Sequence, residues 1–319
     1  MTILQIILLI VAAIIGTLLL LIIKRKINYP EKSYLYCFLN AILAPLRLLK
    51  LGPYSISAND LDAFMKRASK MTKLTDFGGT EFVYSYKLLL DTDYHKSLVY
   101  SNLGYIAAQL DVIFVLVARL RKTQYIKENP GILNVPVREP VFVMGLPRTG
   151  TTFLHRLLSL DPKVRAPLLW ELANSVPMVP TNASFEAKQK CRQKRCNLLK
   201  KLLKRREFVG DDALTHIHEI GADLPEECLV AMREDMPLNL QYLMSLYMNF
   251  DYIYERVPAT HTYVWYKKVL QILSFQFSEE EARTPRRWML KCPVHLLYTK
   301  EIATVFPDAK IIWYVHSYF

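Results

Sequence analysis

The sequence lacks the cysteine patterns that build disulfide frameworks or zinc sites. Its five cysteines form no Cys-x-x-Cys pair and no Cys/His set at zinc spacing, and their number is odd: Cys37, Cys191, Cys196, Cys228 and Cys292. We therefore predict neither a disulfide scaffold nor a metal site. No internal repeat is visible, and 319 residues with 52% apolar side chains suffice for one large domain or two ordinary ones.

Charge is absent from a long stretch near the N-terminus. Ile3 to Ile23 are 21 residues without a charged side chain, and a helix of that length spans roughly 30 Å, the thickness of a bilayer core. The charged n-region and cleavage site of a signal peptide are not evident. We predict a single-pass transmembrane anchor over residues 1–26. Lys24, Arg25 and Lys26 follow the span, so the positive-inside rule places the body in the cytosol; the Golgi lumen is the alternative.

Residues 27–135 are predicted to form a helical, membrane-proximal region. Its first apolar segment, residues 34–54, carries Arg47, Lys50 and two prolines. This composition fits a helix that lies in the membrane interface better than a second span. A core helix packed on the body is the alternative interpretation.

The net charge of +12 is concentrated in one segment. Residues 188–206 contain ten Lys or Arg and no acid, and leucines recur there at helical spacing. This pattern predicts a basic amphipathic helix. It could present a solvated face over packed leucines, contact anionic lipid headgroups, or recruit an acidic acceptor or donor. Nucleic acid is not a predicted partner, because no recognised binding motif accompanies the run.

Residues 136–319 read as an α/β domain. Apolar runs typical of strands begin at Val141, Arg286 and Asp308, and helical patterns alternate with them. This alternation predicts a P-loop-like parallel sheet flanked by helices. Residues 211–283 are predicted to be mostly helical.

The sequence VFVMGLPRTGTT at residues 141–152 reads as strand, tight loop and helix, the layout of a phosphate cradle. Nucleotide triphosphatases have a lysine after the second glycine of this loop, and here that position is Thr151. Backbone amides, a helix N-terminus and a hydroxyl remain available to an anion, and Arg148 lies inside the loop.

Three blocks of sequence together resemble the nucleotide-dependent sulfotransferases, in the branch of large bacterial and animal sulfotransferase-domain proteins. They are GLPRTGTTFLHRLLSLDP, HEIGADLPEEC and RWMLKCPVHLLYTKEIATVFPDAKIIWYVH. The resemblance implies transfer of a sulfuryl group from 3'-phosphoadenosine 5'-phosphosulfate (PAPS) to a hydroxyl or amine, without a metal. The acceptor is expected to be a small molecule, a lipid or a carbohydrate.

The resemblance also assigns roles to residues. Arg148 would lie beside the sulfuryl group, where its planar fork can bind two oxygens, and Lys291 would reach the bridging oxygen from the end of its strand. The loop that holds the 5'-phosphate would comprise Pro147, Arg148, Thr149, Gly150, Thr151 and Thr152.

Two residues compete as the base that activates the acceptor. Glu171 lies close to where related membrane-bound sulfotransferases place a catalytic glutamate, and its apolar neighbours could raise its pKa. His218 is the alternative, because imidazole titrates near neutrality and cytosolic sulfotransferases use a histidine. Glu226 and Glu227 are expected to cap a helix or to shape the acceptor pocket. His155 is predicted to be a helix surface residue near the donor.

The match departs from the family after the last strand. Members continue with an arginine-aspartate turn and a later serine, which hold the 3'-phosphate of the donor. Here the sequence reads YVHSYF, and Ser317 occupies the expected arginine position. We therefore expect either a piece of a longer enzyme or a catalytically silent, membrane-tethered protein that lacks part of the donor site.

Overall fold

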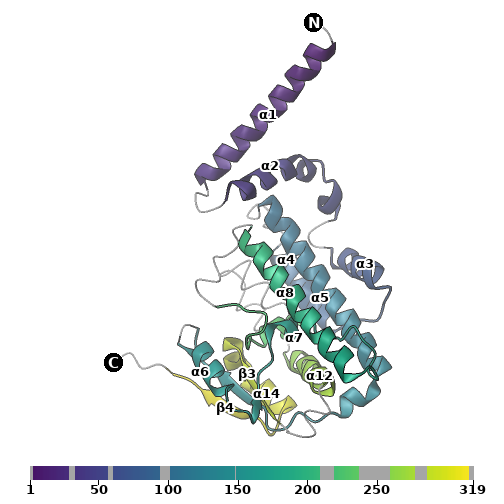
Figure 1. Cartoon of the computed structure of the whole chain (residues 1–319), viewed down its shortest axis with the longest axis vertical. Coiled ribbons are helices and arrows are strands. Elements are labelled where there is room, and N and C mark those ends of the chain that lie inside the picture. The colour runs from purple at the N-terminus through teal and green to yellow at the C-terminus, as the bar shows by residue number, and fades with distance from the viewer. Residues whose placement is uncertain are drawn as a thin grey trace.

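The computed structural model describes residues 3–28, 33–56, 60–93, 101–147, 149–208, 219–236, 259–276 and 286–315. Two helices stand at one end of the molecule, a helical region lies in the middle, and the sheet with its covering helices is at the other end (Figure 1).

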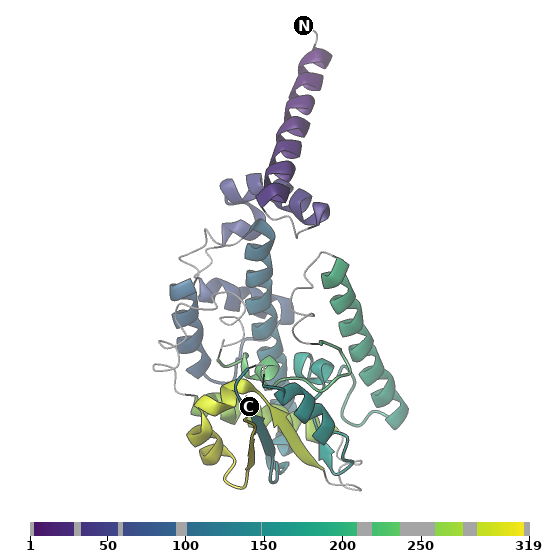
Figure 2. The same ribbon diagram turned by 90° about the vertical axis from the view of Figure 1, so that its left-hand side faces the viewer.

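The first helix, α1 (Ile3–Asn28), projects away from the rest of the chain (Figures 1 and 2). Large apolar side chains along it are exposed, among them Ile14, Leu19 and Leu20. Among the described residues, Ala12–Lys24 is a short apolar helical stretch, and residues 34–55 and 102–128 meet the length and apolarity needed to cross a membrane. The last of these is 56% buried inside the protein, as expected of a core helix.

The second helix, α2 (Tyr34–Leu48), crosses the base of α1 and is tied to the helical region. Asn102 donates its side-chain amide to the Asn40 carbonyl at 2.8 Å, and Arg47 Nη1 donates to Asn102 Oδ1 at 3.1 Å. The helix therefore packs on the body at its buried face, while Tyr34, Leu35 and Phe38 stay exposed.

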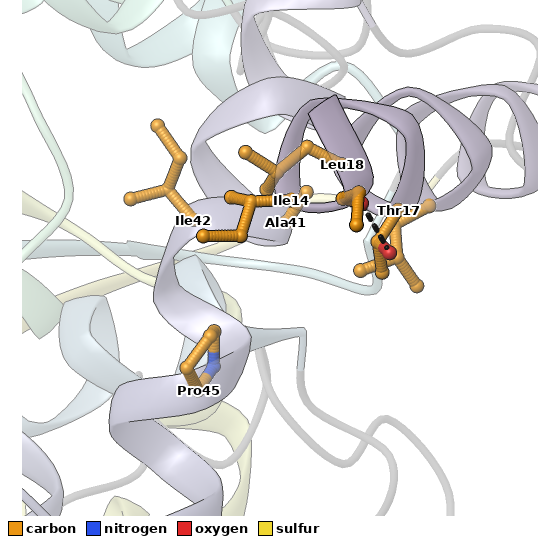
Figure 3. A pocket seen from close by; sticks show the side chains of 8 residues that line it. Ile14, Thr17, Leu18, Ala41, Ile42 and Pro45 are labelled. Carbon is orange, nitrogen blue, oxygen red and sulfur yellow. Dashed lines mark hydrogen bonds between the residues drawn. The ribbon is translucent and has the colours of Figure 1, made fainter. Parts of the chain in front are cut away.

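An apolar hollow of about 530 Å³ lies between α1 and α2 (Figure 3). Ile14 and Leu18 of α1 line it together with Ile42 and Pro45 of α2. The hydroxyl of Thr17 is satisfied within its own helix, since it donates to the Ala13 carbonyl at 2.8 Å. The walls of the hollow are therefore apolar, and the hydroxyl among its lining residues is already hydrogen-bonded.

The helical region is organised around one long helix, α5 (Asn102–Glu128). Ser101 begins it by accepting a hydrogen bond from the Gly104 amide at 3.0 Å, which satisfies an otherwise unpaired donor of the first turn. Its companions are η1 (Gly52–Ser55), α3 (Leu61–Thr72), α4 (Glu81–Asp93) and η3 (Pro130–Asn134).

Buried charges join α5 to the α/β domain. Arg119 is 2% exposed and forms an ion pair with Asp235 at 2.9 Å. Its guanidinium lies over the rings of Phe82 and Trp265, at 4.2 and 4.0 Å from their centroids. Lys122 forms a second buried pair with Glu234. Because an unpaired buried charge is costly, these contacts fix the position of the helical region against the domain.

The sheet has four parallel strands in the order β2-β3-β1-β4. They are β1 (Val141–Met144), β2 (Val164–Arg165), β3 (Arg287–Lys291) and β4 (Lys310–Trp313). The predicted parallel α/β fold is confirmed. Sequence analysis missed β2, because two residues are too short to show a period, and it extended β4 beyond Trp313.

Helices cover the two faces of the sheet. Phe142 and Leu290 point into the main core with α12 (Thr260–Gln276), η4 (Pro293–Leu297) and α14 (Thr299–Val305). Val143 and Met289 point to the other face, where Leu154 of α6 (Thr151–Leu158) packs. Two short helices of the described residues are α7 (Leu169–Ala173) and α9 (Leu229–Met232).

The predicted basic helix exists as α8 (Phe185–Phe208). Leu199 and Leu203 pack against Trp170, whereas Leu198 and Leu202 are 49% and 46% exposed. The alternative of a solvated face over packed leucines therefore holds for Leu199 and Leu203 but not for Leu198 and Leu202. All five cysteines are buried and free.

Candidate functional site

The loop between β1 and α6 is a tight turn that only glycine permits at two positions. A Cβ on Gly145 would lie 2.6 Å from the Tyr314 carbonyl oxygen, and Gly150 begins α6 with a φ of +97°. Thr149 closes the turn by donating to the Leu146 carbonyl at 2.7 Å. Gly145 thus lets the loop pass close to the end of β4, and Gly150 supplies the left-handed backbone at the start of α6. Arg148 lies outside the described residues.

Lys291 lies at the carboxyl end of β3, beside this loop. The residue is 1% exposed, and its ammonium donates to Thr152 Oγ1 at 3.0 Å and to Glu227 Oε1 at 2.6 Å. Lys291 is therefore not a surface lysine: its side chain is buried and faces the first turn of α6. The sequence reasoning placed Lys291 and Thr152 in one site, and the structure brings them into contact.

Glu227 is held at Lys291 by the backbone on both sides of it. The Glu226 amide donates to the Pro167 carbonyl at 3.1 Å, and the Cys228 amide donates to the Lys291 carbonyl at 3.0 Å. The segment therefore runs between α7 and the end of β3. No sequence signal indicated the pair, since its members are 64 residues apart and a glutamate pair before a helix reads first as a cap.

His155 was predicted to be a surface residue, and this prediction is wrong. The side chain is fully buried, and Nε2 donates to the Met289 carbonyl of β3 at 3.1 Å. Nδ1 has no partner among the described residues. Burial lowers the pKa of His155 to about 4, aided by the nearby Lys291 ammonium. The neutral ring thus ties α6 to β3 next to the lysine.

Glu171 lies in the first turn of α7 and is 3% exposed. Both of its oxygens are engaged: Oε1 accepts from Arg165 Nη2 at 2.8 Å, and Oε2 accepts from the Leu168 amide at 3.0 Å. Trp170 and Leu172 are buried beside it, as the sequence suggested. Arg165 is the partner that sequence analysis missed. The other candidate base, His218, lies outside the described residues.

Comparison with protein families matches residues 140–315 to the "Sulfotransferase family". More than half of the chain matches, and the chain therefore belongs to this family. Its fold is similar to sulfotransferase STF1 from Mycobacterium tuberculosis H37Rv, with a TM-score of 0.64 and 26% identity over 82% of this chain and 68% of that one. Sulfotransferase STF9 from Mycobacterium avium gives a TM-score of 0.66 and 28% identity over 82% and 63%. No curated protein matches.

The residues present fit a phosphosulfate. The N-terminus of α6 and the hydroxyl of Thr152 could donate to its oxygens, and Lys291 could supply a positive charge beside them. Sulfuryl transfer requires positive charge and hydrogen-bond donors around an anionic leaving group.

The buried imidazole makes a pH-dependent contribution to stability. Because the pKa of His155 is about 4 in the folded state and near 6.5 when exposed, its neutral form favours folding above pH 6.5 and this contribution is lost as the pH falls toward 4. His155→Gln keeps a donor toward β3 without titrating. We expect the free energy of unfolding to fall between pH 7 and pH 5 by about 2 kcal/mol less in the variant than in wild type, measured by urea denaturation. Equal losses would show that folding does not lower the pKa of His155.

Proposed function

We propose that this protein transfers a sulfuryl group from PAPS to a hydroxyl or amine acceptor. The observation that carries the proposal is the contact between Lys291 Nζ and Thr152 Oγ1, at 3.0 Å, at the start of the helix after the glycine turn. An ammonium and a hydroxyl at this place suit the bridging oxygen between phosphate and sulfuryl group.

The roles of the residues follow from the bonds that change. The bond between sulfur and the bridging oxygen breaks, a bond between sulfur and the acceptor oxygen or nitrogen forms, and the acceptor loses a proton. In this proposal Lys291 neutralises the charge that develops on the bridging oxygen, and the backbone amides of residues 148–152 bind the 5'-phosphate. Arg148 binds the sulfuryl oxygens. Glu227 keeps the lysine charged and oriented.

We propose Glu171 as the base that accepts the acceptor's proton, with His218 as the alternative. Support for Glu171 is its burial on α7, one segment away from Glu227 through the bridge between Leu168 and Pro225. Its ion pair with Arg165 means that the carboxylate also supports the fold, so stability and activity must be measured together.

A silent binding protein is the second candidate. The observation in its favour is Ser317, which stands where the family supplies an arginine for the 3'-phosphate and which lies outside the described residues. Direct measurement of donor binding separates this candidate from an enzyme.

We also propose that α1 anchors the protein in a membrane, with the body in the cytosol. Its exposed apolar side chains and the apolar hollow toward α2 support this placement, and Lys24 to Lys26 follow the span. The exposed aromatic and leucine side chains of α2 suit the interface beside it. A hydrophobic or lipid-like alcohol then reaches the site most readily, and a carbohydrate is the alternative acceptor.

The first test is donor binding. We expect calorimetry to show that the full chain binds 3'-phosphoadenosine 5'-phosphate, and Lys291→Met to lower the rate of sulfuryl transfer by about 100-fold or more through lost charge stabilisation. Lys300→Met, an exposed lysine on α14, is the matched control and should leave the rate unchanged. Absence of nucleotide binding by the full chain would refute the donor assignment; binding without any transfer would favour the silent protein.

The second test concerns the base. Glu171→Gln keeps one oxygen acceptor, for Arg165 or for Leu168 but not for both. It cannot take a proton, so we expect transfer to fall by about 10²-fold or more, with donor affinity retained. Glu186→Gln, at an exposed glutamate on α8, controls for the loss of charge. Thermal unfolding of each variant separates a folding defect from a chemical one. Full activity of a folded Glu171→Gln protein would favour His218.

The third test concerns the membrane. We expect the full chain to stay in the membrane fraction after carbonate extraction, and a double variant Leu18→Lys, Leu20→Lys to be released, because each central lysine costs roughly 2.5 to 3.5 kcal/mol on insertion. Leu133→Lys, at an exposed position of the body, is the control. Protease should digest the body in sealed vesicles whose cytosolic face is outward. Protection of the body would place it in the lumen instead.

A further inference from the structure

A second, polar pocket lies away from the glycine turn, on the side of Trp170, the residue next to Glu171. It has a volume of about 190 Å³ and is formed by the first half of α8, the last turns of α5 and α12, and residues 177–181. The donor loop follows the carboxyl end of β1, whereas the end of α5 leads through η3 into the start of β1. The pocket is therefore near the amino ends of the strands, toward the lower ends of α5 and α8 in Figure 1.

The walls of this pocket carry three positive charges, from Lys188, Arg192 and Arg195. No Asp or Glu belongs to the lining that the described residues form. Two carboxylates of neighbouring described segments have other partners, since Glu171 pairs with Arg165 and Glu128 accepts from Gln124.

Arg195 is the most unusual of the three. Its side chain is 2% exposed, yet among the described residues it forms no ion pair. Both of its terminal nitrogens share one neutral acceptor, Gln276 Oε1, at 3.2 and 3.3 Å, and Nε has no partner. Its guanidinium lies 4.6 Å from the centroid of the Trp170 ring. Burial lowers the pKa of Arg195, and the negative charge of nearby Glu171 offsets this only in part.

Gln276 arranges the two arginines at the same place. Its side-chain oxygen accepts from Arg195, and its backbone carbonyl accepts from Arg192 Nη2 at 3.2 Å. Its own amide donates to the Ser175 and Ile272 carbonyls at 2.5 and 3.1 Å, which fixes its orientation. Tyr125 and Thr181 add hydroxyl groups to the walls. The cations are thus positioned by the fold before any ligand arrives.

We propose that this pocket binds a tetrahedral oxyanion, phosphate or sulfate. An oxyanion supplies the acceptors and the negative charge that Arg195 lacks, and forked guanidinium groups suit its geometry. The source is solution and not a lipid headgroup at the proposed anchor. Tyr125 lies 23 residues along α5 from Asn102, where α2 is attached, a distance of about 35 Å.

The test uses the full chain with inorganic phosphate, and sodium chloride as the control at equal ionic strength. We expect phosphate to raise the melting temperature of wild type by about 2 °C or more. The rise should be at most half as large in Lys188→Gln and absent in Arg195→Met. Lys194→Gln removes the same charge from an exposed position of α8 that does not line the pocket, and should respond like wild type. The rise should persist in Lys291→Met, which alters the donor site.

Three results would overturn the proposal. One is a rise no larger in phosphate than in chloride, and another is an equal rise in wild type and Lys188→Gln. Because Lys188 is not fully buried, its variant remains informative even if Arg195→Met fails to fold. The third is a rise in melting temperature with phosphate that appears only after Glu279, Glu280 and Glu281 are changed to Gln. Such a result would mean that carboxylates of the chain itself, and not a free oxyanion, pair with the cations of the pocket.

Discussion

The parallel pairing of β1 with β3 is the constraint on which the candidate site depends. It sets Val143 opposite Lys291, so that the lysine reaches the loop that follows β1 and the first turn of α6. A shift by one residue would turn Lys291 to the other face of the sheet and would move Leu290 out of the core that it shares with Phe142. The core and the site therefore require the same register. This register brings Lys291 to Thr152, although the two residues are 139 positions apart in the chain.

The two cationic centres of the molecule differ in how their charge is balanced. Lys291 is buried but has Glu227 as a counter-ion and Thr152 as an acceptor, and the adjacent His155 stays neutral because its burial lowers its pKa to about 4. Arg195 is equally buried, yet its acceptor is an amide. The charge of Lys291 becomes available to stabilise a reaction when a substrate displaces Glu227. The charge of Arg195, which has no paired carboxylate among the described residues, favours the binding of an anion.

One helix connects these features to the proposed membrane end. α5 contacts α2 through Asn102, holds the α/β domain through Arg119 and Lys122, and contributes Tyr125 to the oxyanion pocket. Its polar contacts are buried, so the spacing between the apolar N-terminal helices and the sheet is set by a rigid element. Any acceptor that is delivered from a bilayer would have to cover that distance or enter where α5 and the sheet meet.

The sequence by itself determined the fold class, three of the four strands, the glycine turn and the basic helix, because these depend on local periodicity and on residues close together in the chain. It also named Lys291 and Thr152 as members of one site. Only the tertiary structure decided that Glu227 pairs with Lys291, that Arg165 engages Glu171, that His155 is buried, and that Arg195 lies in a pocket whose described lining has no carboxylate. Those outcomes depend on which distant segments pack together, and a charged residue looks the same in sequence whether it ends in solvent or in a core.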